Sequence, residues 1–227
     1  MSPWGLLLAA AFAVAAGPPL AATSRVLAHR WPVGVELRSA WRAVDGRGFV
    51  FSGLCCSGAL LGAWRWGVGV TLLPFFLLVA VLVLMAAVDL DTKLIPDRLN
   101  AAALGFALPL LAVAAGLGGD WRRFGWALAG AAAMVLILGL AHAVHPAGLG
   151  FGDVKLAPLL GAYLGFAAHS VPDVASRTLG ALFAASLSGS VVGVALWIRH
   201  RRAEPFAFGP FLALGTLTVL LLSPPLL

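Results

Sequence analysis

Residues 67–88 read GVGVTLLPFFLLVAVLVLMAAV, an apolar run without a single charged side chain. A helix that crosses the hydrocarbon core of a bilayer needs about 20 residues of this kind. The run stops at Asp89, and charged residues are frequent over the next ten positions. The stretch therefore predicts a membrane-spanning helix with a carboxylate at its end.

The composition of the whole chain agrees with this run. Of the 227 residues, 61% are apolar and 11% are charged, and the mean hydropathy is +0.99. Soluble domains are about 45–50% apolar and about 25% charged, so both a soluble globular protein and a disordered chain are excluded. The net charge of +6 is spread over separate loops and forms no basic stripe. We therefore expect no nucleic-acid partner.

Further apolar runs predict an all-α protein, a polytopic transmembrane helix bundle in the lipid bilayer. The first run has no Lys or Arg before Arg25, so it is interpreted as a retained helix and not as a signal peptide. Glycine and alanine are frequent in the runs and allow helices to approach closely in lipid. The eight expected spans are 3–23, 48–64, 67–88, 99–117, 124–143, 156–170, 178–198 and 206–224.

The distribution of Lys and Arg predicts the orientation of these spans. With the N-terminus outside, eleven of the fifteen basic residues lie in cytoplasmic loops. The four in outer loops are Arg65, Arg122, Arg123 and Arg177. The positive-inside rule favours this arrangement, which makes the chain a multi-pass protein of the cell (cytoplasmic) membrane. The segments 89–98 and 144–155 then both face the cytoplasm.

Four of the nine acidic residues lie in two short segments that follow or precede a span. Asp89 ends the apolar run, and an ionisable residue at this depth is a candidate for function. Asp97 follows Pro96, where it is expected to N-cap the next helix and to favour its positive dipole end. The remaining acids are assigned to solvated connecting loops: Glu36, Asp45, Asp120, Asp173 and Glu204.

In the second segment, glycines at every second position precede an acidic residue. Gly148, Gly150 and Gly152 lead to Asp153 at the start of an apolar run. Glycine permits backbone conformations and close approaches that other residues do not, so a mobile turn that can meet a substrate backbone is expected here. Lys155 is expected to snorkel to the cytoplasmic face or to orient this turn.

The two segments together suggest a pair of carboxylates on one membrane face. When two carboxylates meet, one holds a proton while the other acts as a base, which is the chemistry of aspartic peptide hydrolysis. Two other functions are open on the residues alone. One is a metal-dependent enzyme acting on lipid head groups, in which Asp89, Asp91 and Asp153 bind Mg²⁺. The other is a proton-coupled transporter.

Three stretches resemble the motifs of a known family, the bacterial type IV prepilin peptidases. They are VDLDTKLIPD at 88–97, GLGFGDVKL at 148–156 and PFAFGPFL at 205–212. They stand in the family's order, and the resemblance covers residues 70–227. The second stretch is also similar to the site of the wider group of GxGD intramembrane aspartic proteases.

The resemblance implies an aspartic endopeptidase with Asp89 and Asp153 as catalytic residues and no metal or other cofactor. The motif positions that support them are Pro96, Asp97, Gly150, Gly152 and Lys155. The implied partners are prepilin or pseudopilin precursors of type IV pili and type II secretion. The family cleaves their short basic leader at the cytoplasmic face, beside their apolar N-terminal helix.

The N-terminal part departs from the family's pattern. Long members carry two cysteine pairs in their first cytoplasmic loop, whereas this chain has only Cys55 and Cys56, inside an apolar run. We therefore divide the chain into a diverged membrane region with a basic loop, residues 1–66, and a peptidase-like membrane domain, residues 67–227. The departure argues against the S-adenosylmethionine-dependent methylation that many long members also perform.

Overall fold

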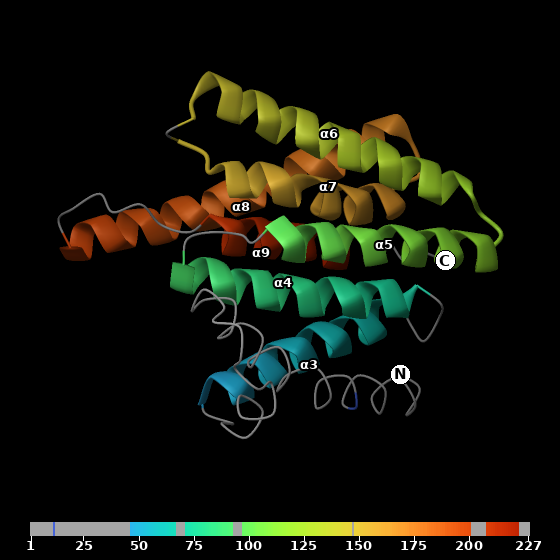
Figure 1. Cartoon of the computed structure of the whole chain (residues 1–227), viewed down its shortest axis with the longest axis horizontal. Coiled ribbons are helices and arrows are strands. Elements are labelled where there is room, and N and C mark those ends of the chain that lie inside the picture. Colours follow the sequence, from blue (N-terminus) through green and yellow to red (C-terminus); the bar gives the residue numbers. More distant parts are fainter. Residues whose placement is uncertain are drawn as a thin grey trace. The chain divides into compact units, whose positions relative to one another are not determined.

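A computed structural model describes residues 11, 46–66, 71–92, 97–146, 148–200 and 208–222. Over these residues every regular element is an α-helix (Figure 1), which confirms the predicted all-α class. The span expected at 3–23 lies outside the described residues, apart from residue 11. The helices are α3 (Gly46–Trp66), α4 (Leu72–Thr92), α5 (Asp97–Leu117), α6 (Arg122–Val144), α7 (Phe151–Phe166), α8 (Val171–His200) and α9 (Gly209–Leu222).

Four of the described helices are long and apolar enough to cross a membrane. These are α4, α5, α6 and α8, and α9 is a shorter apolar helix. Many of their large hydrophobic side chains are exposed, among them Leu136 on α6 and Phe183 on α8. Such faces are suited to lipid, so the helices support a helical membrane protein. The count of eight spans and the outer N-terminus stay predictions.

The chain divides into two compact units between Thr92 and Lys93. In the first unit, α3 packs on α4 through glycines. A Cβ atom at Gly58 would lie 2.8 Å from Val79 Cγ1, and one at Gly62 would lie 2.3 Å from Phe75 Cε1. The helices therefore meet where α3 has no side chain. The expected boundary between a diverged region, 1–66, and a peptidase-like domain, 67–227, differs from this division into compact units. It stays a prediction.

In the second unit, α7 is the central helix. It packs most extensively on α6 and also contacts α5, α8 and α9 (Figure 1). The close approach of α6 and α7 uses glycine on both sides, since a Cβ atom at Gly161 would lie 2.3 Å from the Gly130 carbonyl oxygen. Short loops reverse the chain between α5 and α8, so α5 and α7 begin at the same end of this unit. That end carries the candidate site.

Helix α8 begins at Val171, seven residues before the expected span, and this corrects two assignments. Asp173 and Arg177 were expected in a loop, but both lie in the first two turns and form an ion pair, with Arg177 Nε 2.7 Å from Asp173 Oδ1. The early start has a local cause. Ser170 Oγ accepts the Asp173 N–H at 3.3 Å, and the Asp173 carboxylate accepts the His169 N–H at 3.0 Å. The first bond satisfies a donor that a helix start leaves free, and the second ties the residue before Ser170 to the first turn.

Candidate active site

The first candidate acid, Asp89, lies in the last turn of α4. Its side chain is 6% exposed, and Val88 before it is fully buried. The apolar run of α4 carries the helix through to this position, so a carboxylate is placed where water is scarce. Burying an ionised group is costly, which agrees with a functional role. Pro96 and the side chain of Asp91 lie outside the described residues.

The second candidate acid, Asp153, lies in the first turn of α7 and is also 6% exposed. Gly150 caps the helix, and its carbonyl oxygen accepts the Asp153 N–H at 3.1 Å. The positive end of the helix dipole favours a negative charge at this place. Asp153 is thus a buried acid on a regular helix end.

The expected mobile glycine turn needs a correction. Gly152 belongs to α7, and Gly150 has φ −63° and ψ 139°, a conformation open to any residue. Conformational freedom is therefore not what Gly150 contributes. A Cβ atom at this position would lie 3.4 Å from Asp153 Oδ2, so the glycine leaves space beside the carboxylate. The helix starts five residues earlier than the predicted span because the glycines do not interrupt it.

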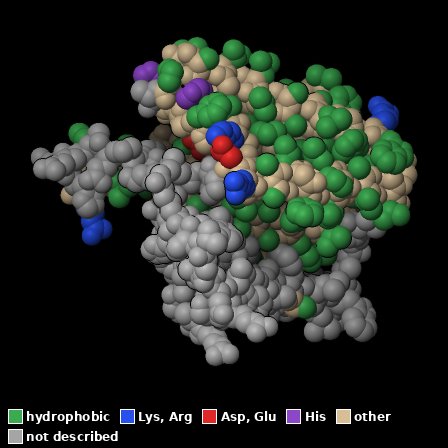
Figure 2. Space-filling view, viewed as in Figure 1, with side chains coloured by type: hydrophobic (Ala, Val, Ile, Leu, Met, Phe, Trp, Pro, Cys, Tyr) green, Lys and Arg blue, Asp and Glu red, His purple; other side chains and the backbone are tan. Residues whose placement is uncertain are grey.

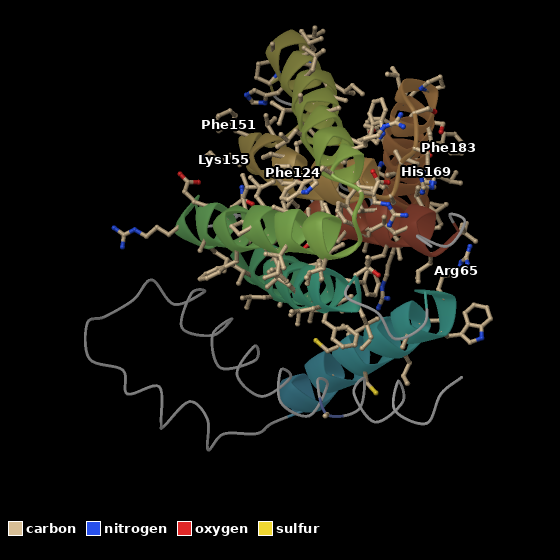
Figure 3. The ribbon with its side chains drawn as sticks, turned by 90° about the vertical axis from the view of Figure 1, so that its right-hand side faces the viewer. Arg65, Phe124, Phe151, Lys155, His169 and Phe183 are labelled. Carbon is tan, nitrogen blue, oxygen red and sulfur yellow. The ribbon has the colours of Figure 1, made fainter. Side chains whose placement is uncertain are left out.

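Lys155 joins the starts of α5 and α7. Its Nζ lies 2.6 Å from Asp97 Oδ1 and 4.9 Å from the centre of the Phe151 ring (Figure 3). Its carbonyl oxygen accepts a hydrogen bond from the buried amide of Asn100 on α5. Asp97 was expected to be the N-cap that precedes α5, but α5 starts at Asp97 itself. Its carboxylate pairs with Lys155 at the start of α5, and the two roles expected for Lys155, snorkelling and orienting the turn, stay predictions.

Two histidines contact the segment that leads into α7. His142 lies in the last turn of α6, and His145 caps the end of that helix. His142 Nδ1 donates to the Leu149 carbonyl oxygen at 2.8 Å, and its ring centre lies 5.4 Å from that of Phe151. His145 lies so close to Gly148 that a Cβ atom there would be 2.3 Å from His145 Cδ2. Sequence analysis gave neither histidine a role, because nothing in their spacing reveals a contact that forms only when α6 and α7 pack.

The arrangement as a whole brings one acid and its supporting residues together. Asp153, Asp97 and Lys155 gather in the second unit, whereas Asp89 belongs to the first. The proximity of Asp89 to Asp153 stays a prediction. Figure 2 shows a largely hydrophobic face on which acidic and basic side chains meet in one small group, with histidine side chains nearby. Over the described side chains, no three His, Cys, Asp or Glu residues gather as metal ligands.

Comparisons with known proteins point to one family. A model described as "Type IV leader peptidase family" matches residues 76–194. A protein named prepilin leader peptidase/N-methyltransferase from Burkholderia pseudomallei (strain K96243) is 35% identical over 185 residues, which is 77% of this chain and 53% of that protein. Its namesake from Bacillus subtilis (strain 168) is 33% identical over 155 residues, 67% of this chain and 57% of that protein.

A third namesake, from Aeromonas salmonicida, is 34% identical over 157 residues, which is 66% of this chain and 48% of that protein. The chain thus spans about half the length of the curated relatives it matches. No solved structure matches it.

Proposed function

Because the chain belongs to the type IV leader peptidase family, we propose that it is an aspartic endopeptidase that removes the leader of a prepilin or pseudopilin precursor. Asp89 and Asp153 are the proposed catalytic residues, within a peptidase-like domain at 67–227. One observation carries this proposal. Inside the matched residues 76–194, both motif aspartates are buried carboxylates at helix ends.

In the proposed reaction the two carboxylates share one proton. The ionised one takes a proton from water while the water oxygen attacks the scissile carbonyl carbon. The protonated one hydrogen-bonds to the carbonyl oxygen and then gives its proton to the leaving amine as the C–N bond breaks. Both carboxylates must lie close to the scissile bond, so we propose that Asp89 and Asp153 meet at the cytoplasmic face.

The surroundings of Asp153 support this chemistry. Lys155, two residues after Asp153, is paired with Asp97, which partly neutralises a charge that would favour ionisation of both acids. A Cβ atom at Gly150 would lie 3.4 Å from Asp153 Oδ2, so the absence of a side chain at this position favours access of a substrate to the carboxylate. The charge distribution along the chain supports a cytoplasmic location for this end of α7.

The proposal covers cleavage and not methylation. The curated relatives are named prepilin leader peptidase/N-methyltransferase, and both activities are said of those proteins. The cysteine pairs expected in the first cytoplasmic loop of long members are replaced here by other residues. The proposal therefore concerns release of the leader, and methyl transfer is not part of it.

The test is cleavage of a tagged model prepilin, with a short basic leader before an apolar helix, co-expressed with the wild type or with Asp89→Asn or Asp153→Asn. We expect cleavage to fall at least about 10²-fold in both variants while membrane insertion is unchanged. Asp120→Asn, in the loop at the other end of α6, is the matched control and should cleave normally. Normal cleavage by either motif variant would contradict the assignment.

A chelator arm separates this proposal from its alternatives. A water mechanism with two aspartates keeps its rate when EDTA is added to purified protein. A metal-dependent enzyme would lose its activity and regain it with Mg²⁺. A transporter would cleave nothing in either arm.

A further inference from the structure

The backbone that carries Asp153 is tied to two other helices, once before the acid and once after it. His142 on α6 donates its Nδ1–H to the carbonyl oxygen of Leu149, four residues before Asp153. Asn100 on α5 donates its amide to the carbonyl oxygen of Lys155, two residues after it. The first turn of α7 is thus clamped from both sides within one compact unit.

The bond of His142 determines which ring nitrogen carries a hydrogen. A carbonyl oxygen has no proton to give, so the 2.8 Å contact requires the hydrogen to be on Nδ1. In the neutral ring this leaves Nε2 as an acceptor. The ring also lies against Phe151, the first residue of α7, with centres 5.4 Å apart and planes inclined at 44°. His142 therefore holds both the turn and the helix start.

The presence of an amide side chain at position 100 is not explained by a contribution to the stability of the fold. The side chain is 8% exposed, and its Oδ1 atom is buried without a hydrogen-bond partner among the described residues. An unsatisfied buried acceptor is unfavourable, and an apolar side chain of similar size would avoid it. What only the amide supplies is the donor to the Lys155 carbonyl oxygen.

We propose that His142 and Asn100 are positioning residues that fix the orientation of the Asp153 carboxylate by clamping the backbone on either side of it. The inference rests on the proposed function, because that function gives Asp153 its part in the reaction. Neither side chain needs to touch the substrate. A displacement of about 1 Å in a reacting group can lower a rate about 10²-fold, so a clamp of this kind affects kcat more than KM.

A pair of substitutions at His142 isolates the hydrogen bond. The amide nitrogen of Asn takes the place of Nδ1, whereas that of Gln takes the place of Nε2. We expect His142→Asn to cleave the model prepilin at close to the wild-type kcat, and His142→Gln to lose about 10–100-fold in kcat with KM unchanged. His169→Gln, in the loop after α7, is the control and should behave as wild type.

A substitution at Asn100 separates positioning from folding. Asn100→Leu removes the donor and the unsatisfied acceptor together. We expect a melting temperature in detergent that is equal to or above that of the wild type, with kcat reduced about tenfold or more. A parallel loss of melting temperature and kcat would overturn the proposal in favour of a purely structural role.

Hydrogen exchange tests the clamp without relying on cleavage. Peptides that cover 149–156 should exchange their backbone hydrogens faster in His142→Gln and Asn100→Leu, while peptides from α9 should not change. Wild-type kcat in both variants, or unchanged exchange over 149–156, would overturn the inference. A wild type that fails to cleave but shows the expected exchange pattern would refute the proposed function alone.

Discussion

At the scale of single residues, two of the ion pairs described in the second unit, Lys155–Asp97 and Arg177–Asp173, differ in their exposure and therefore in their energetic role. Lys155 and Asp97 have side chains that are 34% and 69% exposed. Pairs in contact with water contribute about 0–1 kcal/mol to stability. Arg177 is 5% exposed and its partner Asp173 is 28% exposed, so desolvation matters much more for this second pair.

For the exposed pair we predict a small effect. Asp97→Asn and Lys155→Met should each lower the free energy of unfolding by less than about 1 kcal/mol, because water screens both charges. Thermal unfolding of the two variants and of their double mutant in detergent gives the coupling energy. A coupling well above this limit would show that the Lys155–Asp97 pair is shielded from water.

For the second pair, in which Arg177 is buried and Asp173 is half-buried, we predict a larger effect. Asp173→Asn should destabilise the protein by about 3 kcal/mol, because it leaves the Arg177 charge buried without its partner. The double variant Asp173→Asn/Arg177→Met should recover most of that loss, since it removes the buried charge as well. Melting temperatures of the two proteins decide this, and a double variant no more stable than the single one would contradict it.

A site residue could be predicted from the sequence only where its neighbours along the chain mark it as unusual. Asp89 and Asp153 stand out because an acid adjoins a long apolar run, and the structure finds both buried. His142 and Asn100 act on carbonyl oxygens 7 and 55 positions away, and no pattern along the chain reveals such bonds. The Ser-x-x-Asp pattern at 170–173 is a local signal for a helix start that the hydropathy argument did not use.

At the scale of helices, hydropathy predicts that a helix exists and hardly constrains how it packs. The seven expected spans that fall on described residues each correspond to a helix. Their ends differ from expectation where a cap or a turn sets them, as at Phe151 and Val171. Which of the many glycines form a helix crossing depends on the neighbouring helix, so Gly130 and Gly161 were not distinguishable from the others in the sequence.

Two glycines of α6 provide a matched test of that packing. A Cβ atom at Gly130 would meet the backbone of α7, with Gly161 O at 2.3 Å, whereas one at Gly125 would meet nothing within 4 Å. Gly130→Ala should therefore destabilise the protein by about 2–3 kcal/mol through overpacking. Gly125→Ala should be neutral or stabilise it by up to about 1 kcal/mol, because alanine favours the helix. Equal melting temperatures would contradict the close approach of α6 and α7.

At the scale of the whole molecule, the proposed function depends on which side of the membrane the two motifs face. Helix α7 has a described loop residue at each end, His145 before it and His169 after it, and both are exposed. If the basic residues orient the chain as the positive-inside rule requires, the end with His145 and Asp153 faces the cytoplasm. The proposed cleavage of a basic leader requires the same orientation.

Labelling of single cysteines tests this orientation in intact cells. In a background with Cys55 and Cys56 replaced by alanine, His169→Cys should react with a membrane-impermeant maleimide. His145→Cys should react only after the cells are opened, because its loop faces the cytoplasm in the predicted topology. The two positions lie at opposite ends of one helix, so each is the control for the other. The reverse pattern would place Asp153 on the outer face, and a leader that stays in the cytoplasm would then be out of its reach.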